Sequence, residues 1–180
     1  MKLVSAFCLI FFSCFAAIKC KGQTSLMQDS VKEFKHAIGA GAGFTTGYGL
    51  SYRFIPKRFG MQVNFAPYHT SETDRYSVGL TFLCRLIQSR NSNLFLYQGN
   101  HYFYNSETIS YVERPHPGQT TEPPIVTTKN IERYVNNGLG IGIEFIIAKR
   151  IAFDLMAGYA AYDNFNKVNF TGETGLYFKF

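Results

Sequence analysis

His69, Thr70 and Ser71 form the arrangement in this chain whose residue types and spacing best suit covalent chemistry. On an extended strand, residues two apart lie on the same face, so the His69 imidazole can act as the base that activates the Ser71 hydroxyl. A base of this kind also needs a carboxylate that orients it. Glu72 follows directly, but it points to the other face if the strand continues. His69 and Ser71 are therefore candidate catalytic residues. We favour the simpler interpretation that this segment is a junction between a strand and a loop.

Other residue types that carry chemistry are scattered. The four histidines lie on different segments, without the spacing of metal ligands. They are His36, His69, His101 and His116. Gly39, Gly41 and Gly43 alternate with other residues and no helical pattern follows them, so they do not fit the dinucleotide-binding fingerprint. We predict no metal and no cofactor, and we interpret these glycines as space for large side chains opposite them.

The elements that would carry these residues follow from an alternation of apolar and other side chains with a period of two, which is typical of strands. Such segments follow one another from Lys35 to the end of the chain. Their approximate bounds are 35–44, 48–54, 61–67, 76–85, 94–104, 135–145, 151–160 and 173–180. The fifth segment is the least regular, because the aromatic residues Phe95, Tyr97 and Phe103 share a face with His101. A bulge in this segment would explain the irregularity.

One face of these segments is apolar along its length, and the opposite face carries glycine, small polar and charged residues. The charged residues on that second face are Arg53, Arg85, Glu144, Asp154, Glu173 and Lys179. In lipid every backbone hydrogen bond must be satisfied internally, so an even set of strands closed into a barrel fits best. The charges then pair across a narrow lumen, where they serve structure rather than catalysis. The predicted fold is all-β, an eight-stranded antiparallel transmembrane up-and-down β-barrel.

The last residues of the chain place apolar side chains at alternate positions and end on Phe180. Gly175, Phe178 and Phe180 fit an order of polar, any, Gly, any, any, apolar, any, apolar that starts at Glu173. This order resembles the C-terminal signal that the outer-membrane barrel assembly machinery reads. The resemblance implies insertion of the last strand into the bacterial outer membrane.

The beginning of the chain indicates secretion. An apolar run over residues 3–18 is too short for a good membrane-spanning helix and is typical of a signal peptide. Small residues before Gln23 place the cut between Gly22 and Gln23. A lipoprotein acylated at Cys14 or Cys20 is the alternative. The expected organisation is a signal peptide over 1–22, a short periplasmic segment over 23–34 and the barrel over 35–180.

Removal of the signal peptide changes the charge. The full chain has 18 basic and 12 acidic residues, a net charge of +6. Three of the basic residues lie in 1–22, which leaves a net charge of +3 without a basic stripe, so no nucleic-acid partner is predicted. Cys84 is then the single cysteine, which excludes an intramolecular disulfide. The aromatic share of 17% without Trp is compatible with Tyr and Phe at membrane interfaces.

From Lys35 to Phe180 the architecture and the terminal pattern resemble the small OmpA- and OmpX-type outer-membrane barrels of Gram-negative bacteria. The resemblance implies a cell-envelope protein that contacts outer-membrane lipids, lipopolysaccharide and the barrel assembly machinery. The His69 to Ser71 segment resembles the His-x-Ser element of outer-membrane lipid A deacylases, which gives an enzyme as a first alternative. A secreted lipocalin-like binding barrel, with its apolar face inward, is the second alternative.

The connections alternate in length. With both termini in the periplasm, 56–60, 89–93 and 148–150 are short periplasmic turns, whereas 45–47, 70–74, 106–130 and 163–167 face outside. Only 106–130 is long, and its prolines and threonines predict an extended loop without a core. We predict a non-enzymatic outer-membrane protein with a structural or adhesion-like role, in which residues 106–130 contact a surface ligand. Eight strands leave an interior that side chains can fill, which disfavours a pore.

Overall fold

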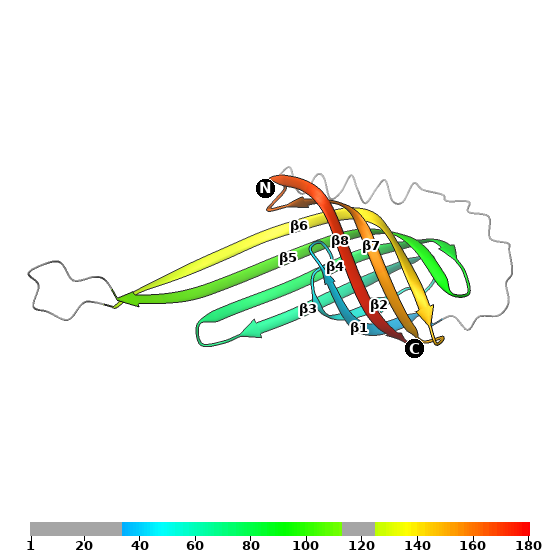
Figure 1. Cartoon of the computed structure of the whole chain (residues 1–180), viewed down its shortest axis with the longest axis horizontal. Coiled ribbons are helices and arrows are strands. Elements are labelled where there is room, and N and C mark those ends of the chain that lie inside the picture. The colour runs from blue at the N-terminus through cyan, green and yellow to red at the C-terminus, as the bar shows by residue number, and fades with distance from the viewer. Residues whose placement is uncertain (1–33, 113–124) are drawn as a thin grey trace, which may run out of the picture. The chain divides into compact units, whose positions relative to one another are not determined.

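The computed structural model describes residues 34–112 and 125–180. The predicted signal peptide and the central part of the predicted loop lie outside the described residues. Eight strands are present in chain order (Figure 1). They are β1 (His36–Gly43), β2 (Gly49–Phe54), β3 (Phe59–His69), β4 (Thr73–Gln88), β5 (Ser92–Val112), β6 (Ile125–Ile147), β7 (Ile151–Tyr162) and β8 (Lys167–Lys179). Within the described part of the chain, no helix is long and apolar enough to cross a membrane.

The strands form a closed antiparallel ring in which each strand pairs with its neighbours in sequence and β8 pairs back with β1. The ring closes through seven residue pairs, from Ala37 opposite Lys179 to Gly43 opposite Glu173. Phe180 extends this closure, because its backbone N–H donates to the His36 carbonyl at 2.9 Å and its carbonyl accepts from the His36 N–H. The predicted eight-stranded up-and-down barrel is confirmed.

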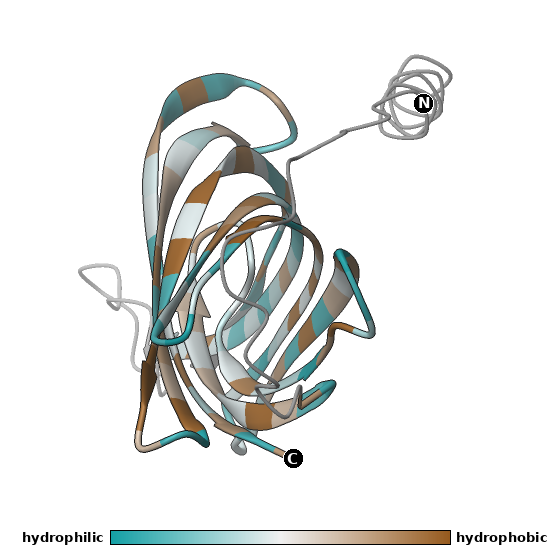
Figure 2. Cartoon of the chain, turned by 90° about the vertical axis from the view of Figure 1, so that its right-hand side faces the viewer, coloured by the Kyte–Doolittle hydropathy of each residue, from teal (hydrophilic) through white to brown (hydrophobic). Residues whose placement is uncertain are grey.

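The two faces of the wall differ in the way that the alternation predicts. Large apolar side chains remain exposed on the outer face of every strand, and Figure 2 shows the resulting bands of alternating hydropathy along the strands. Examples from the strands are Ile38, Leu50, Val63, Leu80, Ile141, Leu155, Leu176 and Phe178. The buried side chains that point inward are mostly polar or charged. A soluble protein has the reverse distribution, so the outer face is built for an apolar solvent.

Strand β5 alternates without a bulge of its own. Phe95 and Tyr97 are buried inside, and the register irregularity lies in its pairing with β4, between Arg85 and Ile87. The outer face of β5 carries two amides, Gln98 and Asn100, in place of apolar residues. The two side chains bond to each other in both directions, at 2.8 and 3.1 Å, which satisfies them on an otherwise apolar surface. These amides outside and aromatic residues inside make the alternation of β5 less regular than that of the other strands.

The predicted loop over 106–130 is shorter than its sequence suggested. Pairing between β5 and β6 continues to Val112 opposite Ile125, so 106–112 and 125–130 are strand rather than loop. By contrast, β4 pairs with β5 only as far as Thr73 opposite Glu107. The two strands therefore extend past the rest of the wall as a two-stranded hairpin (Figure 1). The β-branched residues of this stretch, together with Tyr111, favour strand despite the prolines of the intervening segment.

Candidate functional site

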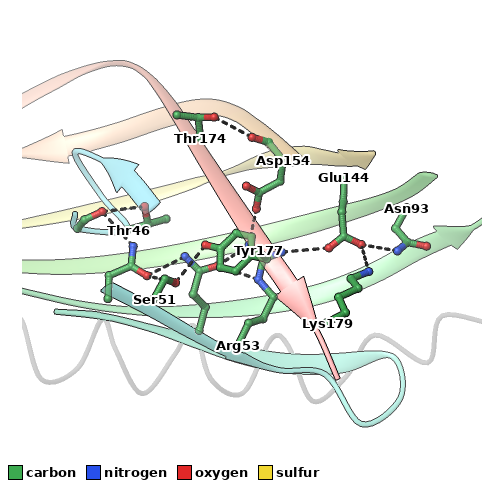
Figure 3. A network of polar contacts seen from close by, with 12 residues as sticks. Thr46, Ser51, Arg53, Asn93, Glu144, Asp154, Thr174, Tyr177 and Lys179 are labelled. Carbon is green, nitrogen blue, oxygen red and sulfur yellow. Dashed lines mark hydrogen bonds and ion pairs between the residues drawn. The ribbon is translucent and has the colours of Figure 1, made fainter. Parts of the chain in front are cut away.

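Arg53 is the centre of the barrel interior. Its side chain points inward from β2 and is 2% exposed. The guanidinium forms ion pairs with Glu144 of β6, at 3.3 Å, and with Asp154 of β7, and it donates to the Gln62 side chain of β3 (Figure 3). The Tyr177 ring of β8 lies 4.0 Å from the guanidinium carbon, within cation–π range. One arginine thus connects strands from opposite sides of the ring.

The network continues toward the end of the barrel where β1 begins and β8 ends. The Lys179 ammonium bonds to Glu144 at 2.6 Å, and the Asn93 amide donates to the same carboxylate at 2.6 Å (Figure 3). Four of the six predicted lumen charges, Arg53, Glu144, Asp154 and Lys179, therefore meet in one cluster. Arg85 lies elsewhere and donates to Gln88 at 2.9 Å in an exposed position. Buried ion pairs need additional hydrogen bonds, like those from Asn93 to Glu144 and from Arg53 to Gln62, to offset the desolvation of their charges.

Glu173, the sixth predicted lumen charge, holds a different element. The chain between β1 and β2 does not face outward but turns into the lumen, and we call residues 44–48 the plug. The Glu173 carboxylate accepts from the backbone N–H groups of Thr45, at 3.2 Å, and Thr46, at 2.9 Å, and from the Thr45 hydroxyl. Both threonines are at most 1% exposed. The prediction that 45–47 forms an outer loop is therefore wrong.

The opposite wall binds the plug through its carbonyl groups. The Phe44 carbonyl accepts from the His101 imidazole and from the Asn136 amide, both at 3.0 Å. The Gly47 carbonyl accepts from the Asn64 amide at 3.0 Å. Side chains from β3, β5 and β6 thus satisfy the polar backbone groups that the plug carries into the interior. Phe44, the last residue of the first predicted strand, belongs to the plug instead.

Three glycines of the wall make room for the plug. A Cβ on Gly79 would lie 1.7 Å from the Thr46 carbonyl oxygen, and one on Gly99 would lie 2.6 Å from the Thr45 carbonyl oxygen. A Cβ on Gly138 would lie 2.6 Å from the Thr45 hydroxyl. Among the glycines for which such a role was predicted, Gly41 lies beside two large inward side chains: a Cβ on it would lie 2.9 Å from the Asn64 amide nitrogen and 3.3 Å from the Tyr177 hydroxyl. The glycines of β4, β5 and β6 therefore determine where the plug can lie.

We expect Glu173→Ala to loosen the plug while the barrel stays closed. Hydrogen bonds to a charged acceptor contribute about 1.5–3 kcal/mol each, so the amide protons of Thr45 and Thr46 should exchange with solvent about tenfold to a hundredfold faster. Amide hydrogen exchange measured by NMR in detergent micelles checks this. Glu72→Ala, which removes an exposed carboxylate near a turn, is the control. Unchanged exchange at both threonines in Glu173→Ala would show that the carboxylate does not hold the plug.

The candidate catalytic residues lie at the exposed connection between β3 and β4. The His69 imidazole Nδ1 forms a hydrogen bond with the carboxylate of Asp74, its cross-strand partner, on the outer face. Asp74 is thus the orienting carboxylate for which the sequence offered only Glu72. Ser71 is exposed in the turn, and within residues 34–112 and 125–180 no hydrogen bond joins it to His69. The structure supplies a histidine and a carboxylate but does not connect them to the serine.

The terminal pattern divides between the two faces of β8. Gly175 points inward, where a Cβ would lie 2.5 Å from the Tyr177 ring. Phe178 and Phe180 are about half exposed on the outer face. The glycine thus gives space to a buried ring, and the two phenylalanines face the surroundings of the barrel.

No protein-family model matches the chain, and no curated protein matches it either. Among solved structures, the chain is similar to the N-terminal β-barrel domain of OprF from Pseudomonas aeruginosa. The TM-score is 0.47 with 11% sequence identity, over 81% of this chain and 95% of that one. It is also similar to Neisserial surface protein A (NspA), with a TM-score of 0.40 and 14% identity, over 81% of this chain and 93% of that one.

Proposed function

We propose that this chain is a non-enzymatic integral protein of the outer membrane with a structural or surface-interaction role. The observation that carries the proposal is the inverted distribution of side chains, with exposed Ile, Leu, Val and Phe around the outer face and a buried ion network inside. The strand ladder closes through the pairing of β1 with β8, as a span through hydrocarbon requires. A lipocalin-like barrel would carry its apolar face inward, so the same distribution disfavours that alternative.

The hairpin of β5 and β6 is the surface that we propose for contact with a partner outside the cell. Past Glu107, β5 pairs only with β6. Ile109 and Tyr111 are about half exposed on one face of this hairpin. Exposed tyrosine and isoleucine on a projecting ribbon are suited to protein–protein contact, because aromatic residues supply much of the binding energy at such interfaces. The hairpin and the barrel thus have separate roles, display and anchorage.

We expect that replacing residues 108–128 by a short linker leaves the barrel folded and abolishes surface binding. Long surface connections contribute little to stability, and the strands of this hairpin pair only with each other. The measurement is attachment of cells of a complemented deletion strain to each other and to an epithelial monolayer. The double substitution Ile109→Ser and Tyr111→Ser should reduce attachment in the same way. Full attachment by the shortened variant would exclude a role of the hairpin.

The hydrogen bond between His69 and Asp74 favours one second candidate, a lipid A deacylase, since it provides an oriented base at the barrel rim. Overexpression followed by mass spectrometry of lipid A decides between the two functions. Our proposal expects no change in the acyl chains. A lipid A species that lacks one acyl chain, and that disappears in Ser71→Ala, would establish the enzyme.

A further inference from the structure

Strand β6 is longer than its neighbour β7, and one part of it pairs on one side only. β6 pairs with β7 as far as Asn137 opposite Ala161, whereas its pairing with β5 continues to Ile125 (Figure 1). Val135 still bonds to the connection after β7, because its N–H donates to the Asn164 side chain at 3.2 Å and its carbonyl accepts from the Asn164 N–H at 3.1 Å. Between residues 127 and 133, no other described residue pairs with this edge of β6.

The direction of the backbone groups at this edge follows from Val135. In an antiparallel ladder, the N–H and C=O groups of alternate residues point to the same side of the strand. Those of Lys129, Ile131 and Arg133 therefore point away from β5, as those of Val135 do. We call residues 127–133 of β6 the open edge. Within the described part of the chain, it offers a row of unpaired donors and acceptors to another strand.

A cavity of about 610 Å³ follows the open edge. Its lining includes four consecutive residues of β6, 131–134, together with residues of the connection between β7 and β8 and with Phe44 of the plug. Side chains of consecutive strand residues point to opposite faces, so a cavity that touches all four lies beside the edge of the strand. The backbone groups of Ile131 and Arg133 thus border a space that can hold an added segment.

The charges around the cavity are mixed and do not select its occupant by themselves. The carboxylates of Glu132 and Asp163 balance the cations of Arg133 and Lys167. The backbone of the open edge is the more selective feature, because a row of alternating donors and acceptors is matched along its length by another extended backbone. The occupant that fits is therefore a peptide in an extended conformation.

The side chains on the outer face of the open edge indicate the composition of such a peptide. Lys129, Ile131 and Arg133 alternate along the strand, share this face and are exposed. Directly opposite side chains of paired strands interact, and opposite charges stabilise the pair. In an antiparallel added strand, acidic residues opposite Lys129 and Arg133, with an apolar residue between them, complement this face.

A second copy of this chain suits the open edge less well. Of the five symmetric antiparallel registers centred on residues 129–133, four place like charges opposite each other. Centring on Ile131 puts Lys129 opposite Arg133. Centring on Lys129, Glu132 or Arg133 puts that residue opposite its own copy. Like charges in directly opposite positions are destabilising, so the open edge is better suited to a different polypeptide.

We propose that the open edge of β6 binds an extended acidic segment of another protein, which adds to β6 as an antiparallel strand. The backbone hydrogen bonds supply the affinity, and Lys129, Ile131 and Arg133 supply the selectivity. This inference deepens the proposed surface-interaction role and rests on it, because the open edge meets a partner only if the hairpin of β5 and β6 lies outside the cell.

A labelled peptide of sequence Thr-Glu-Thr-Val-Thr-Glu-Thr tests the site by fluorescence anisotropy, with the chain folded in detergent micelles. Its glutamates and its valine can lie opposite Lys129, Arg133 and Ile131. A second peptide has lysine in place of both glutamates. Two further peptides carry one N-methyl group, either on the valine, whose N–H would face β6, or on the threonine after it, whose N–H would face away. A shift in mobility between boiled and unboiled samples verifies that each protein variant is folded.

We expect the acidic peptide to bind about tenfold more tightly than the lysine peptide, because two attractive charge pairs become repulsive in the latter. N-methylation of the valine should abolish binding, whereas N-methylation of the threonine should not. The double variant Lys129→Glu and Arg133→Glu should reverse the preference between the two peptides. The control, Lys57→Glu with Arg90→Glu, makes the same change of charge at exposed positions of other connections and should leave the preference unchanged.

Equal binding of the acidic and the lysine peptide, or tight binding of the peptide methylated on valine, would overturn the proposal. Absence of peptide binding while cells still attach through the hairpin would overturn the site and leave the proposed function intact. Peptide binding without attachment of cells would support the site and contradict the adhesion-like role. Dimers that are disrupted by Ile131→Pro, which removes one outward N–H from the edge, would show that a second copy occupies it and would also overturn the proposal.

Discussion

Arg53→Met should lower the free energy of unfolding of the barrel by about 3–5 kcal/mol, because it leaves Glu144 and Asp154 as buried charges without their common partner. Asp154 is fully buried, so water cannot replace the guanidinium. Lys179 still neutralises Glu144 but is not bonded to Asp154. Urea titrations of the protein folded in lipid vesicles, followed by circular dichroism, measure the loss.

Two further variants separate charge from side-chain volume. Arg90→Met removes an exposed arginine from the connection between β4 and β5 and should change the free energy of unfolding by less than about 0.5 kcal/mol. Arg53→Met combined with Glu144→Gln and Asp154→Asn should recover most of the loss, because no buried charge is left unpaired. An Arg53→Met barrel as stable as the wild type would show that the interior network contributes nothing to folding.

Phe178→Asp and deletion of Phe180 should both reduce the amount of folded protein in the outer membrane. A charge on the lipid face costs on the order of 1 to 4 kcal/mol, depending on depth, and Phe178 points outward from β8 between Ile38 and Ile151. Deletion of Phe180 removes two backbone hydrogen bonds with His36 that extend the closure of the ring, and it removes the ring that stacks on His36. The measurement is the heat-modifiable fraction of the protein in outer-membrane preparations.

Asn169→Ala is the matched control on β8, since Asn169 lies on the opposite face and is exposed. We expect a mild effect on the folded amount. Wild-type amounts of folded Phe178→Asp and of the chain without Phe180 would show that the terminal pattern is coincidental.

The strands, their faces and their order could be predicted from sequence because a period of two is a local signal. Between Val135 and Phe145, apolar residues alternate with glycines and Glu144. Each of these residues lies on the predicted face of β6. Arg53 and Asp154 were predicted to be inside for the same reason. Their direct pairing depends on the shear of the whole ring, which brings β2 and β7 side chains to one height, and no local pattern contains that information.

The plug could not be predicted because it depends on residues far apart in sequence. Thr45 to Gly47 has the composition of an ordinary turn, and it enters the lumen only because Gly79, Gly99 and Gly138 leave space and Glu173 accepts its amides. The signal was present as one inward glycine in each of three neighbouring strands. Likewise, Asp74 becomes the partner of His69 through a tight turn, in which the Thr70 N–H donates to the Thr73 carbonyl at 2.8 Å.

We propose that the apolar outer face of this barrel meets the lipid of the outer membrane. Sodium carbonate extraction of separated membrane fractions tests it most directly, since it releases soluble and peripheral proteins and leaves integral ones in place. We predict that the chain remains in the carbonate-washed outer-membrane fraction and migrates differently in boiled and unboiled samples, as a closed ladder without edges resists detergent. Recovery of the chain as a freely soluble secreted protein would contradict the claim.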